Sequence, residues 1–208
     1  MYKKTLFFLF FISSLNVFAQ KNELNLAEYQ KTIEAHRLKY INDFLSEEKA
    51  PIKKEDVPFI QFFDIDVKYR FEATFKKSLG EKPFDLATSS GKMKQYVKYG
   101  ELTFVFEGKN TTISVYQSLG LLNHPLYKDY LFIPFKDLTT GEGSYGAGRY
   151  IDAKFTEIVD NKMIIDFNKC YNPYCAYADG YSCPIPPKEN TLDIAIEAGE
   201  RNFGKARH

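Results

Sequence analysis

Two segments, residues 139–152 and 166–190, concentrate the side chains that could do chemistry. In the first, Arg149 follows a glycine-rich stretch. A guanidinium held at the end of a glycine turn can bind a carboxylate through two hydrogen bonds. The alternative is a structural ion pair with Asp152 or Asp166. The glycines share the letters of a phosphate-binding loop, but no helical pattern follows them, so a tight turn is the favoured interpretation.

Carboxylates and amides form a second group of candidates. Asp152, Asp166 and Glu189, together with Asn168 and Asn172, offer oxygen atoms that suit Ca²⁺ or the hydroxyls of a polyol. Two such carboxylates could also serve as general acid and base in glycoside hydrolysis, with Asp166 or Glu189 as the base. The alternative is that Asp166 and Glu189 accept hydrogen bonds from the backbone of an irregular loop.

All three cysteines lie in the polar, proline-rich segment 166–190, which is typical of a functional or braced loop. In an oxidising compartment Cys175 and Cys183 could form a disulfide, which leaves Cys170 as a small buried residue. A zinc site is disfavoured because the spacing matches no zinc pattern. A nucleophilic thiol would need a base, and His36 and His124 are the candidates for it. The disulfide is the favoured interpretation, and neither a metal nor a cofactor is predicted.

Residues 1–19 have the three parts of a cleavable secretory signal peptide. Lys3 and Lys4 precede an apolar run, and cleavage after Ala19 would leave a chain that starts at Gln20. The apolar run is shorter than the roughly 20 residues that a transmembrane anchor needs. The sequence therefore predicts a periplasmic or secreted protein, with one globular domain over residues 20–208 and no membrane anchor in the mature chain.

The charge balance excludes one class of partner. The chain has 28 Lys and Arg against 27 Asp and Glu. Removal of residues 1–19 takes away two lysines and no acid, so the mature chain carries a net charge of −1. Nucleic-acid binding needs a concentrated positive surface, and we therefore expect no nucleic-acid partner.

Hydrophobic periodicity predicts the elements that position these side chains. Residues 25–46 have helical spacing behind a cap at Asn25, although His36 and Arg37 interrupt the apolar stripe. Alternation over 68–76, a hairpin over 102–116 and apolar runs at 130–135 and 163–167 indicate strands. A second helix is expected from about 190 to 203. The predicted class is mainly β, a β-rich α+β domain: an antiparallel sheet with a barrel-like or sandwich core, and an N-terminal and a C-terminal helix.

The motif segments resemble a known family. Residues 145–152, 166–168, 171–177 and 181–190 resemble the bacterial and archaeal domain-of-unknown-function family 1684, and the similarity extends over about 29–203. The family has no assigned activity, so the resemblance implies motif positions and no reaction. Those positions are Tyr145, Gly146, Gly148, Arg149, Asp152, Asp166, Asn168, Tyr171, Asn172, Cys175, Tyr177, Cys183, Pro184, Glu189 and Asn190.

The leading hypothesis is an exported protein that binds an anionic or sugar-like small molecule in a pocket between the Arg149 turn and loop 171–190. The candidate ligand-binding residues are Tyr145, Arg149, Asp152, Asn168, Tyr171, Asn172, Tyr177 and Glu189. Two alternatives stay open. One is an envelope hydrolase with Asp166 or Glu189 as its base, and the other is a structural or partner-binding envelope protein.

Overall fold

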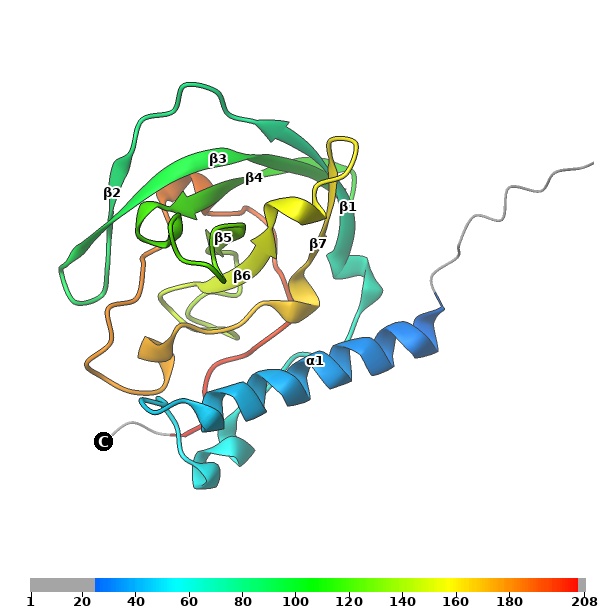
Figure 1. The fold of residues 1–208 in the computed structure, drawn as a ribbon. Coiled ribbons are helices and arrows are strands. Elements are labelled where there is room, and N and C mark those ends of the chain that lie inside the picture. Colours follow the sequence, from blue (N-terminus) through cyan, green and yellow to red (C-terminus); the bar gives the residue numbers. More distant parts are fainter. Residues whose placement is uncertain (1–24, 206–208) are drawn as a thin grey trace, which may run out of the picture.

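The computed structural model describes residues 25–205. The expected signal peptide lies outside the described residues. Figure 1 shows one long helix below a strongly curved sheet. The helix and the strands are α1 (Leu26–Ser46), β1 (Arg70–Lys77), β2 (Phe84–Ala87), β3 (Met93–Phe106), β4 (Lys109–Ser118), β5 (Tyr130–Phe135), β6 (Arg149–Lys154) and β7 (Lys162–Asp166). Short 3₁₀ helices connect them: η1 (Lys54–Phe59), η2 (Val67–Tyr69), η3 (Leu119–Leu121), η4 (Phe155–Glu157), η5 (Phe167–Lys169), η6 (Tyr174–Ala176) and η7 (Lys188–Asn190).

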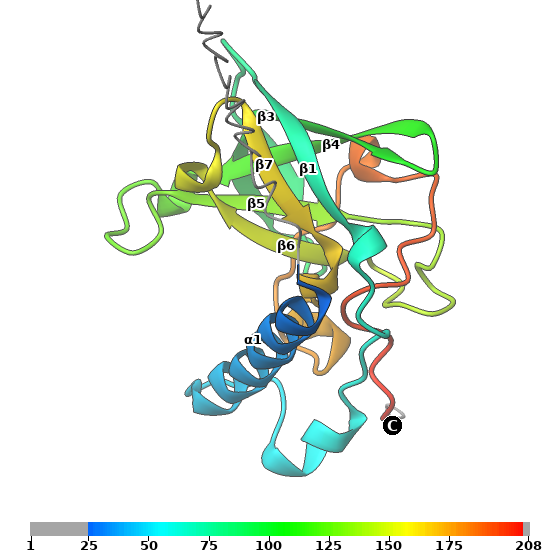
Figure 2. The ribbon, with the colours of Figure 1, turned by 90° about the vertical axis from the view of Figure 1, so that its right-hand side faces the viewer.

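The sheet is antiparallel throughout, in the order β6-β5-β4-β3-β1-β7, and β2 pairs with β3. Its strands curve into a half-barrel (Figures 1 and 2). The β3–β4 hairpin turns at Glu107 and Gly108, both with positive φ, which suits the right-handed twist of the two strands. The predicted mainly β class is confirmed, and the half-barrel matches the barrel-like alternative.

The main core fills the concave side of the half-barrel. Leu102, Phe104 and Phe106 alternate along β3 and are all buried there. Phe167 packs edge-on against Phe135 at 5.2 Å between ring centroids. Such period-two burial explains why the sequence pattern marks these strands well.

Helix α1 begins where its cap predicts. The Asn25 side chain accepts hydrogen bonds from the backbone N–H groups of Ala27 and Glu28, which satisfies donors that lack an intrahelical partner. Near this end the Tyr29 hydroxyl donates to Asp166 Oδ1 at 2.9 Å. That bond ties α1 to the end of β7.

The predicted C-terminal helix is wrong. After η7 the chain is extended, and Leu192, Ile194, Ile196 and Ala198 are buried in the main core, which they join as every second residue. This segment binds the backbone beyond β5 through bonds such as Leu138 N–H to Ile194 O (3.0 Å). Burial of a period-two face in the core outweighs local helix preference here. Gly199 follows with φ +69°, where a Cβ atom would lie 2.3 Å from Cys170 Sγ.

The chain after β7 is irregular apart from its 3₁₀ turns. Cys175 and Cys183 form a disulfide, while Cys170 is a free, buried thiol. The disulfide interpretation of the three cysteines matches the structure. Over residues 25–205, no helix is long and apolar enough to cross a membrane.

Candidate ligand-binding cavity

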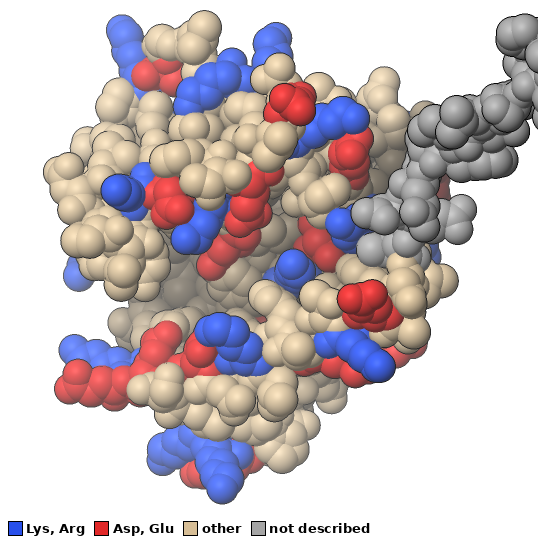
Figure 3. Space-filling view, turned by 45° about the vertical axis from the view of Figure 1, so that its right-hand side comes forward, with Lys and Arg blue, Asp and Glu red and all other residues tan. Residues whose placement is uncertain are grey.

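A cavity of about 880 Å³ lies between α1 and one end of the curved sheet. The surface is hollowed between the sheet and the part of the molecule that holds α1 (Figure 3). One wall comes from α1, the opposite wall comes from β5 and β6, and residues 171–184 close the side. Elements that are distant in sequence therefore build the site together.

Aromatic rings dominate the walls of the cavity. Eight tyrosines and two phenylalanines line it. The rings of Phe132 and Tyr150 are 4.7 Å apart, those of Tyr150 and Tyr171 5.8 Å, and those of Tyr40 and Tyr171 5.7 Å. These contacts hold the rings in fixed orientations and leave flat apolar faces with hydroxyl groups at their edges.

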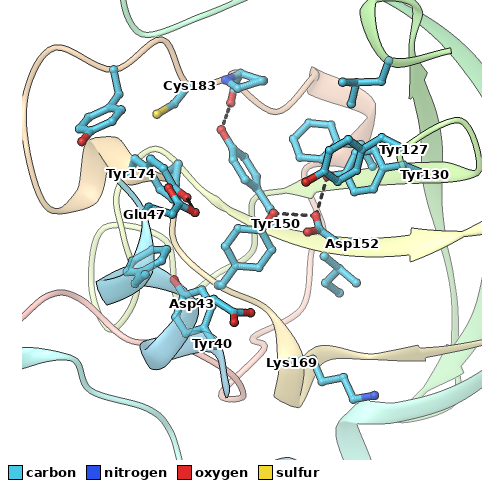
Figure 4. A pocket seen from close by; sticks show the side chains of 18 of the residues that line it. Tyr40, Asp43, Glu47, Tyr127, Tyr130, Tyr150, Asp152, Lys169, Tyr174 and Cys183 are labelled. Carbon is cyan, nitrogen blue, oxygen red and sulfur yellow. Dashed lines mark hydrogen bonds between the residues drawn. The ribbon is translucent and has the colours of Figure 1, made fainter. Parts of the chain in front are cut away.

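Asp152 is the central polar group of the β wall. The hydroxyls of Tyr130 and Tyr171 both donate to its Oδ1 atom at 2.6 Å. Figure 4 shows Asp152 beside Tyr130, with Tyr40 and Asp43 of α1 across the cavity. Among the described residues no side chain or backbone N–H donates to Asp152 Oδ2. This oxygen is an acceptor that a bound molecule can use.

The environment of Asp152 affects its protonation. Its side chain is reachable from the cavity, but surrounding protein atoms replace much of its water, and this desolvation raises its pKa above the ordinary value. The hydrogen bonds from Tyr130 and Tyr171 lower the pKa and offset part of that effect. A ligand hydroxyl that donates to Oδ2 would act in the same direction as the two phenols.

The charges around the cavity balance. Its lining includes three lysines and three carboxylates. On α1, Lys39 Nζ and Asp43 Oδ2 form an ion pair at 2.5 Å. Desolvation, and then the nearby charge of Lys169, lower the pKa of His36. The lining therefore contains equal numbers of lysines and carboxylates.

Behind the cavity, Glu200 joins its walls. The buried carboxylate accepts hydrogen bonds from the Tyr40 hydroxyl (3.1 Å to Oε2), the Asn172 backbone N–H (2.9 Å to Oε2) and the Tyr177 hydroxyl. Burial raises the pKa of Glu200 to about 7, although these donors oppose the shift. Through Glu200, α1, loop 171–184 and the C-terminal segment share one buried network.

Comparison with known families supplies the identification. The family described as "Protein of unknown function (DUF1684)" matches residues 56–201. The chain belongs to the DUF1684 family. In this member the matched region contributes the β wall and the loop of the cavity, whereas α1 precedes it.

The chain is also similar to a solved structure. An uncharacterized protein from Haloarcula marismortui, determined by solution NMR, is 30% identical in sequence with a TM-score of 0.64. The match covers 85% of this chain and 95% of that chain. A search of the curated proteins found no match.

Of the eight ligand-binding candidates predicted for this DUF1684 member, Asp152 and Tyr171 line the cavity. They meet there through the 2.6 Å hydrogen bond between the Tyr171 hydroxyl and Asp152. The other six lie outside the lining: Tyr145, Arg149, Asn168, Asn172, Tyr177 and Glu189.

Arg149 is fully buried at the base of the C-terminal segment. Its guanidinium donates to the backbone carbonyls of Ala198 (2.5 Å), Glu200 (3.1 Å) and Ile196 (2.8 Å), and it pairs with Asp137 Oδ1 at 3.2 Å. Gly148 is required just before it, because at φ +97° a Cβ atom would lie 2.5 Å from Phe135 O. The glycine turn thus directs Arg149 into the core, where it holds the extended C-terminal segment in place.

The remaining candidates belong to separate hydrogen-bond networks. Asn168 Nδ2 donates to the Asp66 carbonyl at 2.8 Å, in the same group as Asp166 and Tyr29. The two carboxylates considered as hydrolytic bases, Asp166 and Glu189, share no hydrogen-bond partner among the described residues. Glu189 Oε1 accepts from the buried Tyr116 hydroxyl at 2.8 Å.

Of the three candidates that are left, Tyr177 bonds to Glu200 as described above, and the other two join loop 171–184 to neighbouring segments. The Tyr145 hydroxyl donates to the Cys175 carbonyl at 3.1 Å. Asn172 Nδ2 donates to the Arg201 carbonyl at 2.7 Å. Both are therefore placed to hold the wall of the cavity in position.

Sequence reasoning missed most of the aromatic lining. Tyr130 and Phe132 fall in a strand read only as apolar, and Tyr40 falls in a helix stripe read as core. One signal was available. His36 interrupts the apolar stripe of α1 because that face of the helix lines a cavity as well as the core.

Proposed function

We propose that this DUF1684 member binds a sugar-like small molecule in the cavity between α1 and the sheet. The main support is the position of Asp152. Its carboxylate accepts hydrogen bonds from the hydroxyls of Tyr130 and Tyr171 and lies among aromatic side chains. Flat rings can pack on the apolar faces of a sugar, while Asp152 Oδ2 accepts from a hydroxyl of the ligand. A concave site with apolar walls and a few convergent polar groups is typical of small-molecule binding.

Charge favours a neutral ligand over an anionic one. The lysines and carboxylates of the lining are equal in number, and Asp152 would repel an anion at the β wall. Arg149, the group expected to bind an anion, already donates to protein carbonyls and to Asp137. We therefore retain the sugar-like ligand of the two kinds expected from the sequence.

The proposal includes export. The signal-peptide pattern of residues 1–19 supports it, and so does the disulfide between Cys175 and Cys183, since disulfides persist in oxidising compartments. The protein would then act in the periplasm or the medium, where it could meet free sugars and polysaccharides.

Calorimetric titration of the mature protein with a panel of sugars tests whether the protein binds a sugar. The panel contains glucose, galactose, mannose and N-acetylglucosamine and their oligomers. For the sugar that binds, Asp152→Asn should weaken binding about tenfold or more, because the variant keeps the shape and loses the charge that strengthens the hydrogen bond.

Asp85→Asn is the matched control, since Asp85 is exposed on β2 and lies outside the lining. Its affinity should equal that of the unmodified protein. Equal affinities for the Asp152 and Asp85 variants, or a panel in which no sugar binds, would contradict the proposal.

A further inference from the structure

Helix α1 and its C-cap residue line the cavity over about three turns. The contributing helical residues recur at spacings of three and four and therefore share one face: His36, Lys39, Tyr40, Asp43 and Phe44, followed by the C-cap Glu47. His36 and Glu47 are eleven residues apart, which corresponds to about 16 Å along the helix axis. The site is thus elongated along α1.

Aromatic side chains are spread along this length. At one end Tyr174 and Tyr181 lie 5.2 Å apart between ring centroids, and the Tyr174 hydroxyl donates to Glu47 Oε1 at 2.5 Å. In Figure 4, Tyr174 and Glu47 lie on one side of Tyr150, while Tyr127 and Tyr130 lie on the other. The cavity volume of about 880 Å³ is near the upper end of the range for small-molecule sites.

We infer that the ligand is an oligosaccharide chain that lies along α1, with successive sugar rings against successive aromatic groups. The inference rests on the proposed function and extends it from a single sugar to a chain. A single sugar would meet Asp152 and the neighbouring rings and would leave the Glu47 end without a contact.

A sugar chain fits the walls better than an extended peptide does. Peptides that bind in extended form usually pair with a free strand edge. The edge strand beside the cavity is β6, and at Tyr150 its N–H and carbonyl are already bonded to Tyr171, at 2.9 and 3.0 Å. What the walls present is ring faces, hydroxyls and carboxylates.

The dependence of affinity on chain length tests the inference. The mature protein is titrated with the mono-, di-, tetra- and hexasaccharides of β-1,4-linked glucose and of β-1,4-linked N-acetylglucosamine, and with tetra-alanine as a peptide probe. We expect at least a tenfold gain from the monosaccharide to the tetrasaccharide in one series, and little further gain for the hexasaccharide. Equal affinity for the mono- and tetrasaccharide would overturn the inference and leave the proposed function standing. Binding of no sugar, or of tetra-alanine alone, would overturn both.

A pair of variants at the C-terminal end of α1 tests whether the oligosaccharide reaches that end of the cavity. Glu47→Gln should reduce the advantage of the tetrasaccharide over the monosaccharide, because it weakens the contacts at that end. Glu48→Gln is the control, since Glu48 is exposed and lies outside the lining. If the two variants keep the same length dependence, the ligand does not reach Glu47, and the inference fails.

Discussion

Glu200 shows how one residue can hold a site that it does not enter. It is fully buried, and its carboxylate accepts from Tyr40 on α1, Tyr177 in the disulfide loop and the backbone of Asn172. The nearby Arg149 guanidinium binds the Glu200 backbone carbonyl. Desolvation is the main reason why the pKa of Glu200 rises to about 7.

This raised pKa predicts a pH-dependent stability. A carboxyl group whose pKa is higher in the folded than in the unfolded chain stabilises the fold most when it is protonated. Its contribution is fully present below about pH 4.5 and is lost as the pH rises through about 7. The free energy of unfolding of the mature protein should therefore fall by roughly 3 kcal/mol from this group between these pH values.

The Glu200→Gln variant isolates that contribution, because glutamine does not titrate and other groups, Asp152 included, titrate in both proteins. Urea unfolding at pH 5 and at pH 8 measures the two free energies. The decrease from pH 5 to pH 8 should be smaller in the variant. Identical decreases would show that Glu200 does not titrate with a raised pKa.

At the scale of single residues, the sequence predicts which positions are unusual better than it predicts what they do. The sequence marks Arg149, which follows a glycine turn, as an unusual position, and in the structure its guanidinium is fully buried. Its partners, however, are the carbonyls of Ile196, Ala198 and Glu200, about fifty positions further along the chain. No local pattern reveals whether a guanidinium meets a ligand or such a distant backbone segment.

Among the elements, loop 171–184 determines one side of the cavity. Its disulfide fixes the loop, and Tyr174, Tyr181 and Pro184 line the cavity from it. The loop also bonds to the β2–β3 connection, since the Ser89 backbone N–H donates to the Cys183 carbonyl at 2.9 Å. The wall is therefore held covalently and through the backbone.

The disulfide is tested by a thiol count and by a variant. Denatured, non-reduced mature protein should show one free thiol per chain, that of Cys170. The double variant Cys175→Ser, Cys183→Ser should lose about 2.6 kcal/mol of stability in urea unfolding, because a loop of about nine residues is no longer closed. Three free thiols, together with unchanged stability of the double variant, would contradict the Cys175–Cys183 disulfide.

The helices and strands that have the most regular hydrophobic periodicity are the ones that the sequence predicts correctly. Helix α1 and the β3–β4 hairpin have long, regular patterns and were predicted correctly. The segment after η7 carries both a helical pattern and an alternating one, and the alternating one is realised. The reason is tertiary: the open side of the half-barrel needs an apolar strip, and Leu192, Ile194 and Ile196 supply it.

At the scale of the whole molecule, a half-barrel with one helix across its end leaves a cavity where the two meet. The aromatic content and the mainly β class could be predicted from composition and alternation. The cavity could not, because it depends on where α1 lies relative to strands β5 and β6, which are more than eighty residues away and form the opposite wall. Helix α1 is held there by its contacts with η5 and with loop 171–184.

The proposed export gives a prediction for the chain that carries residues 1–19. Expression of the full chain in a Gram-negative host, followed by mass measurement of each cell fraction, should find a mature chain that starts at Gln20, in the periplasm or the medium. Cleavage by the export machinery is the physical reason. A chain that keeps its first nineteen residues and stays in the cytoplasm would contradict it.

The location of the bound ligand shows whether the cavity between α1 and the sheet is the binding site. In NMR titration of ¹⁵N-labelled mature protein with the tightest sugar of the panel, the backbone amide shifts should change along both walls of the cavity. We expect the changes at Tyr40 on α1, at Glu47 directly after it, and at Tyr130, Asp152 and Tyr171 on the opposite wall. Saturable changes confined to another surface, or no saturable change with any sugar, would contradict sugar binding in this cavity.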